Sequence, residues 1–233
     1  MIARMTQGGA WAIVPVKRFD RAKSRLAGVF TPSERAALAK AMLGDVLEQL
    51  LCARSLSGVV VVTDDADACA MAAEFGFETE ADPREDGVND AVLRGVGYAR
   101  ARGASAIVVA PGDIPFVTAR ELEAVVSALA SASVALAPAA RDGGTNILGL
   151  APPDAISPAF GENSFARHHA AAKALGAEAF VLALPGASRD VDVAADLAAA
   201  ATLAGGRRTR AWLVRFDLAK RSVSERQCYR GTP

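Results

Sequence analysis

Short runs of apolar residues alternate with longer amphipathic segments along most of the chain. The runs are too short for buried helices, so each predicts a strand covered on both faces. We expect such strands near residues 11–16, 57–63, 77–81, 106–110, 134–138 and 180–184. The amphipathic segments predict helices near residues 31–50, 66–75, 89–102, 118–129 and from about 161. This alternation predicts an α/β fold with a doubly wound parallel sheet.

The composition supports one large domain and excludes two classes of partner. Hydrophobic residues make up 52% of the 233 positions, which is enough to bury a full core. The 26 basic and 26 acidic residues balance, so the molecule offers no general attraction for nucleic acid or an acidic membrane. Gly205 and Gly206 mark the expected end of the domain, which we place at residues 1–205.

The segment that follows differs from the rest of the chain in charge. Eight basic and two acidic residues follow Gly206, which gives the segment a net charge of +6 and leaves −6 for residues 1–206. It has little patterned apolar surface despite its Trp212, Leu213 and Val214. We therefore expect residues 206–233 to form a basic tail and not a domain.

The cysteines and the N-terminus favour a cytoplasmic protein. Cys52, Cys69 and Cys228 are odd in number, far apart and without paired metal spacing, which predicts a reduced protein with no structural zinc. Residues 1–10 lack the apolar core of a signal peptide, and no later run is long enough to span a membrane.

One carboxylate stands directly after the strand expected at 106–110. Two prolines and a glycine stop this strand and leave Asp113 near its C-terminal end. Ligands of open α/β sheets bind at that edge, where a carboxylate is well placed to hold a divalent metal on a phosphate. The alternative is that Asp113 caps the helix expected from Thr118.

Positive charge is concentrated directly after the first strand. Five basic residues and one acid lie between Lys17 and Leu26. A cationic loop at this point of a doubly wound sheet is suited to grip a nucleoside triphosphate, and a solvated charged turn is the alternative. We favour phosphate binding, with Lys17, Lys23 and Arg25 as the candidate contacts.

Two further polar positions are candidates for nucleotide binding. Asp64 and Asp65 end the strand at 57–63, where either could contact a ribose or a base, although we expect at least one to cap the next helix. Asn89 lies near a helix start and either stabilises that terminus or recognises a ligand through its amide. We retain Asp64 and Asn89 as nucleotide-binding candidates.

The second half of the chain contains a glycine-rich run suited to an anion. Gly143, Gly144 and Thr145 offer backbone N–H groups and a hydroxyl, and Arg141 can clamp a carboxylate or phosphate. A hairpin turn is the alternative interpretation, and a turn can also carry a ligand.

A second anion site is expected where the helix after Phe160 begins. Gly161, Ser164 and Arg167 would combine free N–H groups, a hydroxyl and a guanidinium at that helix terminus. His168 and His169 follow, but neighbouring histidines on a helix point in different directions and are more often structural. We assign no chemical role to either.

A second acidic position completes the candidate site. Asp190 and Asp192 alternate in an extended segment and should face the same side, so Asp192 could join Asp113 on one or two metal ions. Asp190 and Asp196 have helix capping as an alternative role. The chain lacks a P-loop and a dinucleotide-binding glycine signature, which argues against a P-loop kinase and a nicotinamide dehydrogenase.

Taken in order, these motifs resemble those of the 2-phospho-L-lactate guanylyltransferase family of coenzyme F420 biosynthesis. Some members of this family use phosphoenolpyruvate or 3-phosphoglycerate. The resemblance covers about residues 11–204. Its most specific motifs are Pro15-Val16-Lys17 with Ala22-Lys23-Ser24-Arg25-Leu26, Gly144-Thr145-Asn146, and Gly161-x-x-Ser164-Phe165-x-Arg167-His168.

The resemblance implies a Rossmann-like three-layer α/β/α sandwich with a mixed, mostly parallel sheet, as in molybdenum-cofactor nucleotidyltransferases. It also implies that GMP is transferred from GTP to the phosphate of a small phosphorylated carboxylic acid, with release of pyrophosphate. Asp113 and Asp192 would hold Mg²⁺, while Lys17 and Lys23 would bind the triphosphate. We take Lys17, Lys23 and Asp113 as the catalytic residues.

For the acceptor, the resemblance implies contacts from Thr145, Gly161 and Ser164, to which we add Arg167. The sequence departs from the expected pattern in two places. Pro-Gly-Asp-Ile-Pro replaces Pro-Ala-Asp-Leu-Pro at the end of the central strand, and Glu162 puts an acid near the acceptor, where it could tune which acid is accepted.

Two alternatives to this function remain at the level of the sequence. One is a related nucleotidyltransferase that uses another nucleotide, or a sugar phosphate or cofactor as acceptor. The other is a non-catalytic protein whose basic tail binds an acidic partner. The sequence does not fix the assembly, for which a homodimer is one option.

Overall fold

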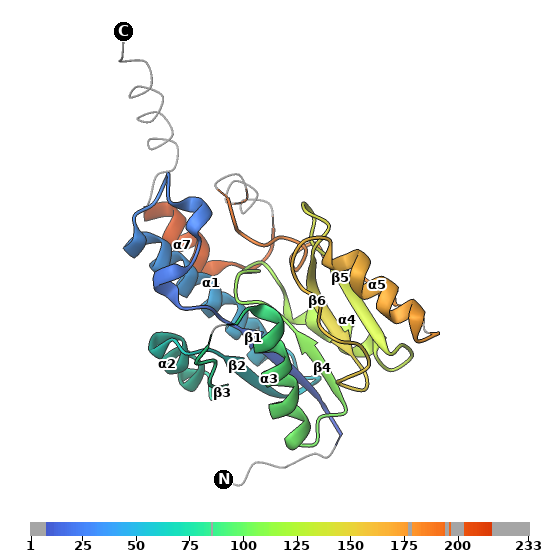
Figure 1. Ribbon diagram of the computed structural model, residues 1–233. Coiled ribbons are helices and arrows are strands. Elements are labelled where there is room, and N and C mark those ends of the chain that lie inside the picture. The colour runs from blue at the N-terminus through green and yellow to red at the C-terminus, as the bar shows by residue number, and fades with distance from the viewer. Residues whose placement is uncertain (1–7, 85, 177–178, 194–195, 197–202, 216–233) are drawn as a thin grey trace.

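A computed structural model describes residues 8–84, 86–176, 179–193, 196 and 203–215. Its centre is one seven-stranded sheet with the order β3-β2-β1-β4-β6-β5-β7 (Figure 1). The strands are β1 Ala10–Pro15, β2 Leu56–Val62, β3 Glu78–Glu80, β4 Ala106–Val109, β5 Val134–Pro138, β6 Thr145–Leu150 and β7 Phe180–Val181. Neighbouring strands are parallel except at β6, which is antiparallel to both β4 and β5. The predicted mixed, mostly parallel sheet is confirmed.

Helices cover both faces of this sheet. They are α1 Pro32–Cys52, α2 Ala66–Glu74, α3 Val88–Ala101, α4 Ala119–Ala128, α5 Ser164–Ala174 and α7 Arg207–Arg215. Two short 3-10 helices, η1 Phe19–Arg21 and η2 Ser24–Leu26, lie in the basic segment after β1. The charged loop expected there is thus partly helical.

Alternation along β1 separates the two hydrophobic layers. Ala12 and Val14 belong to the cluster formed with α1, α2, α4 and α7, whereas Trp11 and Ile13 belong to the cluster formed with α3 and α5. Successive side chains of a strand point to opposite faces, so a strand buried on both faces feeds two cores. The three-layer α/β/α sandwich expected from the family resemblance is confirmed.

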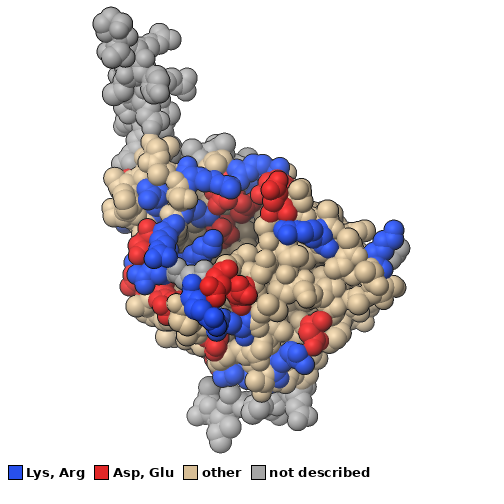
Figure 2. All heavy atoms as spheres, viewed as in Figure 1, with Lys and Arg blue, Asp and Glu red and all other residues tan. Residues whose placement is uncertain are grey.

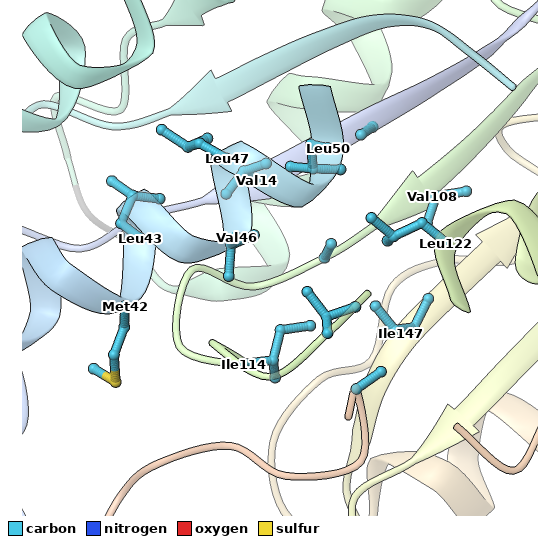
Figure 3. Packing of buried hydrophobic residues seen from close by; sticks show 14 of the residues in the cluster. Val14, Met42, Leu43, Val46, Leu47, Leu50, Val108, Ile114, Leu122 and Ile147 are labelled. Carbon is cyan, nitrogen blue, oxygen red and sulfur yellow. The ribbon is translucent and has the colours of Figure 1, made fainter. Parts of the chain in front are cut away.

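Helix α1 supplies much of the larger core. Thr31 accepts a hydrogen bond from the Glu34 N–H, and the Glu34 carboxylate accepts one from the Thr31 N–H, so a capping box fixes the start of the helix. Leu43, Val46 and Leu47 then point towards the sheet and the loop after β4 (Figure 3). The helix has the packing role expected from its apolar spacing.

Packing on the other face of the sheet requires a close approach of α3 to β1. A Cβ atom on Gly95 of α3 would lie 2.4 Å from a methyl carbon of Ile13 on β1. Only a residue without a side chain allows this helix to pack so closely on the strand. The approach fixes the position of the start of α3, which borders the candidate site.

Helix α7 lies beyond the boundary that we predicted at residue 205. It packs beside α1 (Figure 1), and its Trp212 is buried with its ring centroid 5.0 Å from that of Phe30. The buried carboxylate of Asp45 on α1 accepts hydrogen bonds from the N–H groups of Arg208 and Thr209, both at 2.8 Å. The first part of the expected tail is therefore packed against the domain, and residues 216–233 lie outside the described residues. In the described chain, no helix combines the length and apolarity needed to cross a bilayer.

We expect Asp45→Ala to lower the free energy of unfolding by about 2 kcal/mol, because two N–H groups at the start of α7 lose a buried acceptor. Urea denaturation of the full chain measures this loss. Asp67→Ala, which removes an exposed carboxylate, is the control. Equal stability of the two variants would show that the Asp45 contacts do not hold α7 in place.

The strand order places the candidate site between β1 and β4. The chain runs from β1 outwards to β2 and β3 and then returns to β4 on the other side of β1. Ligands of open α/β sheets bind outside the carboxyl ends of the strands where the order reverses. Lys17 follows β1 and Asp113 follows β4, so both lie at this point of the sheet.

Candidate active site

A buried lysine joins the two predicted metal-binding aspartates. Lys23 Nζ lies 2.9 Å from Asp113 Oδ2 and 2.8 Å from Asp192 Oδ1, and only 7% of the Lys23 side chain is exposed. The Lys23 backbone adopts the left-handed conformation (φ 52°, ψ 43°), which is uncommon outside glycine. Two aspartates separated by almost eighty residues thus converge on one cationic group.

Backbone contacts bring the Asp192 segment to the end of β4. The Val191 N–H donates to the Asp113 carbonyl at 3.1 Å. Five residues earlier, a Cβ atom on Gly186 would lie 2.0 Å from the Phe116 carbonyl oxygen, so only glycine fits against this loop. Asp196 accepts the N–H groups of Asp192 and Val193, both at 2.8 Å, and holds the turn that presents Asp192.

Asp113 is not a helix cap. Thr118 caps α4 through a capping box with Glu121, which leaves the Asp113 carboxylate directed at Lys23. The capping alternative for Asp113 is therefore wrong.

The charges in this cluster perturb one another. Burial alone would lower the pKa of Lys23, but the charges and hydrogen bonds of Asp113 and Asp192 outweigh it and raise that pKa above its ordinary value. Burial opposes ionisation of Asp192, yet Lys23 and then Arg25 bring its pKa below the ordinary value. Burial and the charges of Asp113 and Asp192 raise the pKa of Asp190. Lys23 and Asp192 therefore stabilise each other's charged forms.

A cavity of about 670 Å³ opens next to this cluster. It lies between the basic segment after β1, the middle of α1, the start of α3 and the loop after β4. Lys17 lines it and forms no hydrogen bond or ion pair with a described residue. Figure 2 shows basic and acidic side chains gathered around a hollow in the face of the molecule seen there. The size suits a nucleotide.

A second cavity of about 490 Å³ adjoins the first, since Arg25 and Asp192 line both. Its other walls come from the β5–β6 turn and the start of α5. Arg25 Nη1 lies 3.4 Å from Asp192 Oδ2, at the border between the two cavities. Two compartments thus meet at the charged cluster.

Three of the four predicted acceptor residues line the second cavity. Thr145, Gly161 and Ser164 all lie on its wall. The hairpin that we left as an alternative is formed as well, since Thr145 begins β6 directly after the turn from β5. The N–H groups expected to be free at the start of α5 are partly used, because those of Ser164 and Phe165 donate to carbonyls of Gly161 and Gly143.

Three predicted contacts lie outside both cavities: Asp64, Asn89 and Arg167. Asp64 is exposed, and its neighbour Asp65 caps α2 and accepts the Phe19 N–H at 2.9 Å. Asn89 neither caps α3 nor faces a cavity, because its amide pairs with both backbone groups of Phe160. Arg167 donates to the same Phe160 carbonyl. For Asn89 and Arg167 the geometry supports a structural role.

Two further charged residues lie at the site: Asp190, which was not assigned a ligand contact, and Arg141, which was expected to clamp a carboxylate or phosphate. Asp190 is close enough for its charge to couple to Asp113 and Asp192, and Arg141, which pairs with Asp196 at 3.0 Å, lines the second cavity. The alternation of Asp190 with Asp192 was the available signal for Asp190. Nothing in the sequence indicated that Arg141 would pair with Asp196.

No group of three His, Cys, Asp or Glu side chains suited to a metal ion occurs in the described part of the chain. Asp113 and Asp192 nevertheless direct carboxylate oxygens at one cationic atom. Mg²⁺ in nucleotide enzymes is often held by one or two carboxylates, with phosphates and water as the remaining ligands. The two carboxylates therefore suit a cation site in which substrate phosphates and water supply the remaining ligands.

The sequence of the chain matches a known protein family. The family described as guanylyl transferase CofC like matches residues 10–229. The chain belongs to this guanylyl transferase family. The members of a CofC-like family are nucleotidyltransferases, which agrees with a site built from lysines and carboxylates.

Curated relatives of this CofC-like protein cover most of its length. It is 41% identical over 186 residues to a phosphoenolpyruvate guanylyltransferase of Sphaerobacter thermophilus, covering 80% of this chain and 89% of the relative. It is 37% identical over 203 residues to a 3-phospho-D-glycerate guanylyltransferase of Phenylobacterium zucineum, covering 86% and 93%.

Solved structures show the same fold at low sequence identity. A candidate nucleotide-diphospho-sugar transferase from Desulfovibrio desulfuricans has a TM-score of 0.74 at 19% identity, covering 92% of the CofC-like chain and 99% of the other. A nucleotidyl transferase from Methanothermobacter has a TM-score of 0.58 at 17% identity, covering 82% and 95%. These likenesses support the fold alone.

Proposed function

We propose that the protein transfers GMP from GTP to the phosphate of a small phosphorylated carboxylic acid and releases pyrophosphate, as a step of coenzyme F420 biosynthesis in the cytoplasm. The candidate acceptors are 2-phospho-L-lactate, phosphoenolpyruvate and 3-phosphoglycerate. The family assignment and the named activities of the two curated relatives support this reaction class.

The observation that carries the proposal is the meeting of two cavities at one charged cluster. The larger cavity, with Lys17 on its wall, would hold GTP, and the smaller one, with Thr145 and Ser164, would hold the acid. Asp192 lines both, so the α-phosphate of GTP and the phosphate of the acid would approach each other beside Lys23. Such an approach lowers the barrier by positioning the two reactants.

The chemistry needs no general base from the protein. An oxygen of the acceptor phosphate is already anionic and attacks the α-phosphorus of GTP, while the bond from that phosphorus to the oxygen shared with the β-phosphate breaks. Pyrophosphate leaves with the electron pair of that bond. Lys17, Lys23 and Arg25 would neutralise the phosphate charges that otherwise repel one another. This accounts for a site of lysines and carboxylates.

We propose Mg²⁺ as the metal, held by Asp113 and Asp192. When bound, it would supply positive charge to the reacting phosphates. The geometry supports this assignment, because both carboxylates direct an oxygen at the same cationic atom, Lys23 Nζ.

The experiment is to incubate the full chain with GTP, Mg²⁺ and each of the three acids, and to measure pyrophosphate. We expect release that requires both GTP and one of the acids, with little release when ATP, CTP or UTP replaces GTP. No acid-dependent release from any of the four nucleotides would refute the proposal.

Glu162 is expected to select among the acids. It lines the smaller cavity, and no described residue forms a hydrogen bond or ion pair with it. An unpartnered carboxylate repels an anionic acceptor unless the acceptor carries a donor, and only 3-phosphoglycerate of the three acids has a free hydroxyl.

We therefore expect Glu162→Gln to lower the ratio of kcat/KM for 3-phosphoglycerate to kcat/KM for phosphoenolpyruvate by about tenfold. Steady-state kinetics with both acids measure the ratio. Glu74→Gln, an exposed position on α2, is the matched control. The same ratio in both variants would show that Glu162 does not discriminate.

A further inference from the structure

His168 is fully buried and is held through both of its ring nitrogens. The Ala159 N–H donates to His168 Nε2 at 2.8 Å. A nitrogen that accepts a hydrogen bond carries a lone pair and no proton. Burial, and secondarily the charge of Arg167, lowers the pKa of His168 to about 4, so the ring is neutral near pH 7. Its single proton must therefore lie on Nδ1.

The proton on Nδ1 fixes the direction of the next hydrogen bond. His168 Nδ1 lies 3.0 Å from Thr145 Oγ1, so the ring donates and the hydroxyl accepts. Thr145 Oγ1 has no other hydrogen-bond partner in the described part of the chain. The hydrogen of this hydroxyl is thus left to donate to a group from outside the protein.

Ser164 is arranged in the same way. Its Oγ accepts the N–H of Thr145 at 2.8 Å, and no described acceptor receives the hydroxyl hydrogen. Both residues line the smaller cavity. Each of these two neighbouring hydroxyls therefore accepts a hydrogen bond from the protein and can donate its own hydrogen to a ligand. Two such donors suit an anionic ligand.

We infer that His168 is a positioning residue for the acceptor, because it forces the Thr145 hydroxyl to act as a hydrogen-bond donor into the smaller cavity. The inference rests on the proposed function, which places the phosphorylated acid there. The backbone N–H of Thr145 donates to the Ser164 hydroxyl oxygen, so this hydroxyl also acts as a donor into the smaller cavity. The Ala159 N–H donates to His168, His168 donates to Thr145, and Thr145 donates to the acceptor, so all three hydrogen bonds run in the same direction.

The first test reads the tautomer directly and needs no substitution. The chain contains two histidines, and His169 is exposed, so the ring nitrogens of His168 can be assigned in a long-range proton–nitrogen NMR spectrum of the ¹⁵N-labelled full chain. We expect a neutral ring near pH 7 with the proton on Nδ1. A proton on Nε2, or a charged ring, would overturn the inference.

The second test separates the two hydrogen bonds of the ring. The amide of His168→Asn can donate from about the position of Nδ1, whereas the amide oxygen of His168→Gln can accept from Ala159 at about the position of Nε2. We expect His168→Gln to raise the acceptor KM about tenfold, and His168→Asn to stay within about threefold of the wild type. The KM for GTP should change in neither variant.

A double-mutant cycle with Thr145→Val distinguishes positioning from simple packing. Once the hydroxyl is absent, His168→Gln should cost nothing further in acceptor KM. Equal losses in the Asn and Gln variants, or a full loss from His168→Gln in the Thr145→Val background, would contradict the inference. If a variant fails to fold, the NMR result decides. If the wild type shows no acid-dependent pyrophosphate release, the proposed function fails, and the tautomer result still stands or falls on its own.

Discussion

Asp113→Asn should lower kcat for pyrophosphate release by about a thousandfold while the protein stays folded. Asn has nearly the same shape, but it lacks the charge that Asp113 contributes to the convergence on Lys23 and to the proposed Mg²⁺ site. Losing a carboxylate that holds a metal on a reacting phosphate removes several kcal/mol of stabilisation from the transition state, which corresponds to a rate change of this size. Pyrophosphate release at saturating GTP and acid measures the effect.

The control for this variant is Asp154→Asn. Asp154 is an exposed carboxylate paired with Arg100 and follows β6, which runs antiparallel to β4, so it lies at the opposite edge of the sheet. Its turnover should equal that of the wild type. Turnover of Asp113→Asn within tenfold of this control would show that Asp113 is not part of the reacting site.

Lys23→Met is the second substitution expected to have a large effect. Methionine fills most of the same space but leaves Asp113 and Asp192 facing each other without their shared ammonium group. We expect kcat/KM for GTP to fall by about a hundredfold, because the triphosphate loses a cation and meets stronger negative charge. Steady-state kinetics with varied GTP measure the loss.

Lys173→Met provides the comparison for this substitution. Lys173 is exposed in the last turn of α5, so its removal changes the net charge equally without altering the cluster. A similar small loss in both variants would indicate that Lys23 only contributes to the overall charge. A large loss in Lys23→Met with an unchanged KM for GTP would place its role after nucleotide binding.

Most strand positions and the strand-end residues Lys17 and Asp113 could be predicted, because local signals in the sequence determine them. Val108 and Val109 belong to a run too short for a buried helix, and the prolines after it leave Asp113 at the carboxyl edge of a parallel strand. Strand β6 was not predicted. Its Gly149 lies where a Cβ atom would come within 2.9 Å of Val125, so packing against α4, and not a long apolar run, requires that residue.

The pairing of Lys23 could not be predicted from the sequence. It depends on the backbone contact between Val191 and Asp113, which joins two loops that are distant along the chain. The same limit applies to α7, which lies in the segment predicted to be a basic tail and not a domain. Arg208 Nη1 instead pairs with Glu48 at 2.6 Å, while Trp212 is buried against Phe30.

His168 shows a different limit. The sequence of two adjacent histidines in a helix does not indicate which ring nitrogen of His168 is protonated. The Ala159 N–H that determines this belongs to a loop outside the helix. The Thr145 and Ser164 positions could be found from their motifs. The direction of their hydrogen bonds required the structure.

The most direct test of guanylyl transfer at this site follows the α-phosphate of GTP. The full chain is incubated with Mg²⁺, a mixture of the three acids and GTP radiolabelled at the α-phosphate. The products are then separated, and their masses are measured by mass spectrometry. We predict that the label moves into a compound with the mass of GMP joined to one acid, with one unlabelled pyrophosphate released per product. Label that remains in GTP, or that appears only in free GMP, would contradict the account.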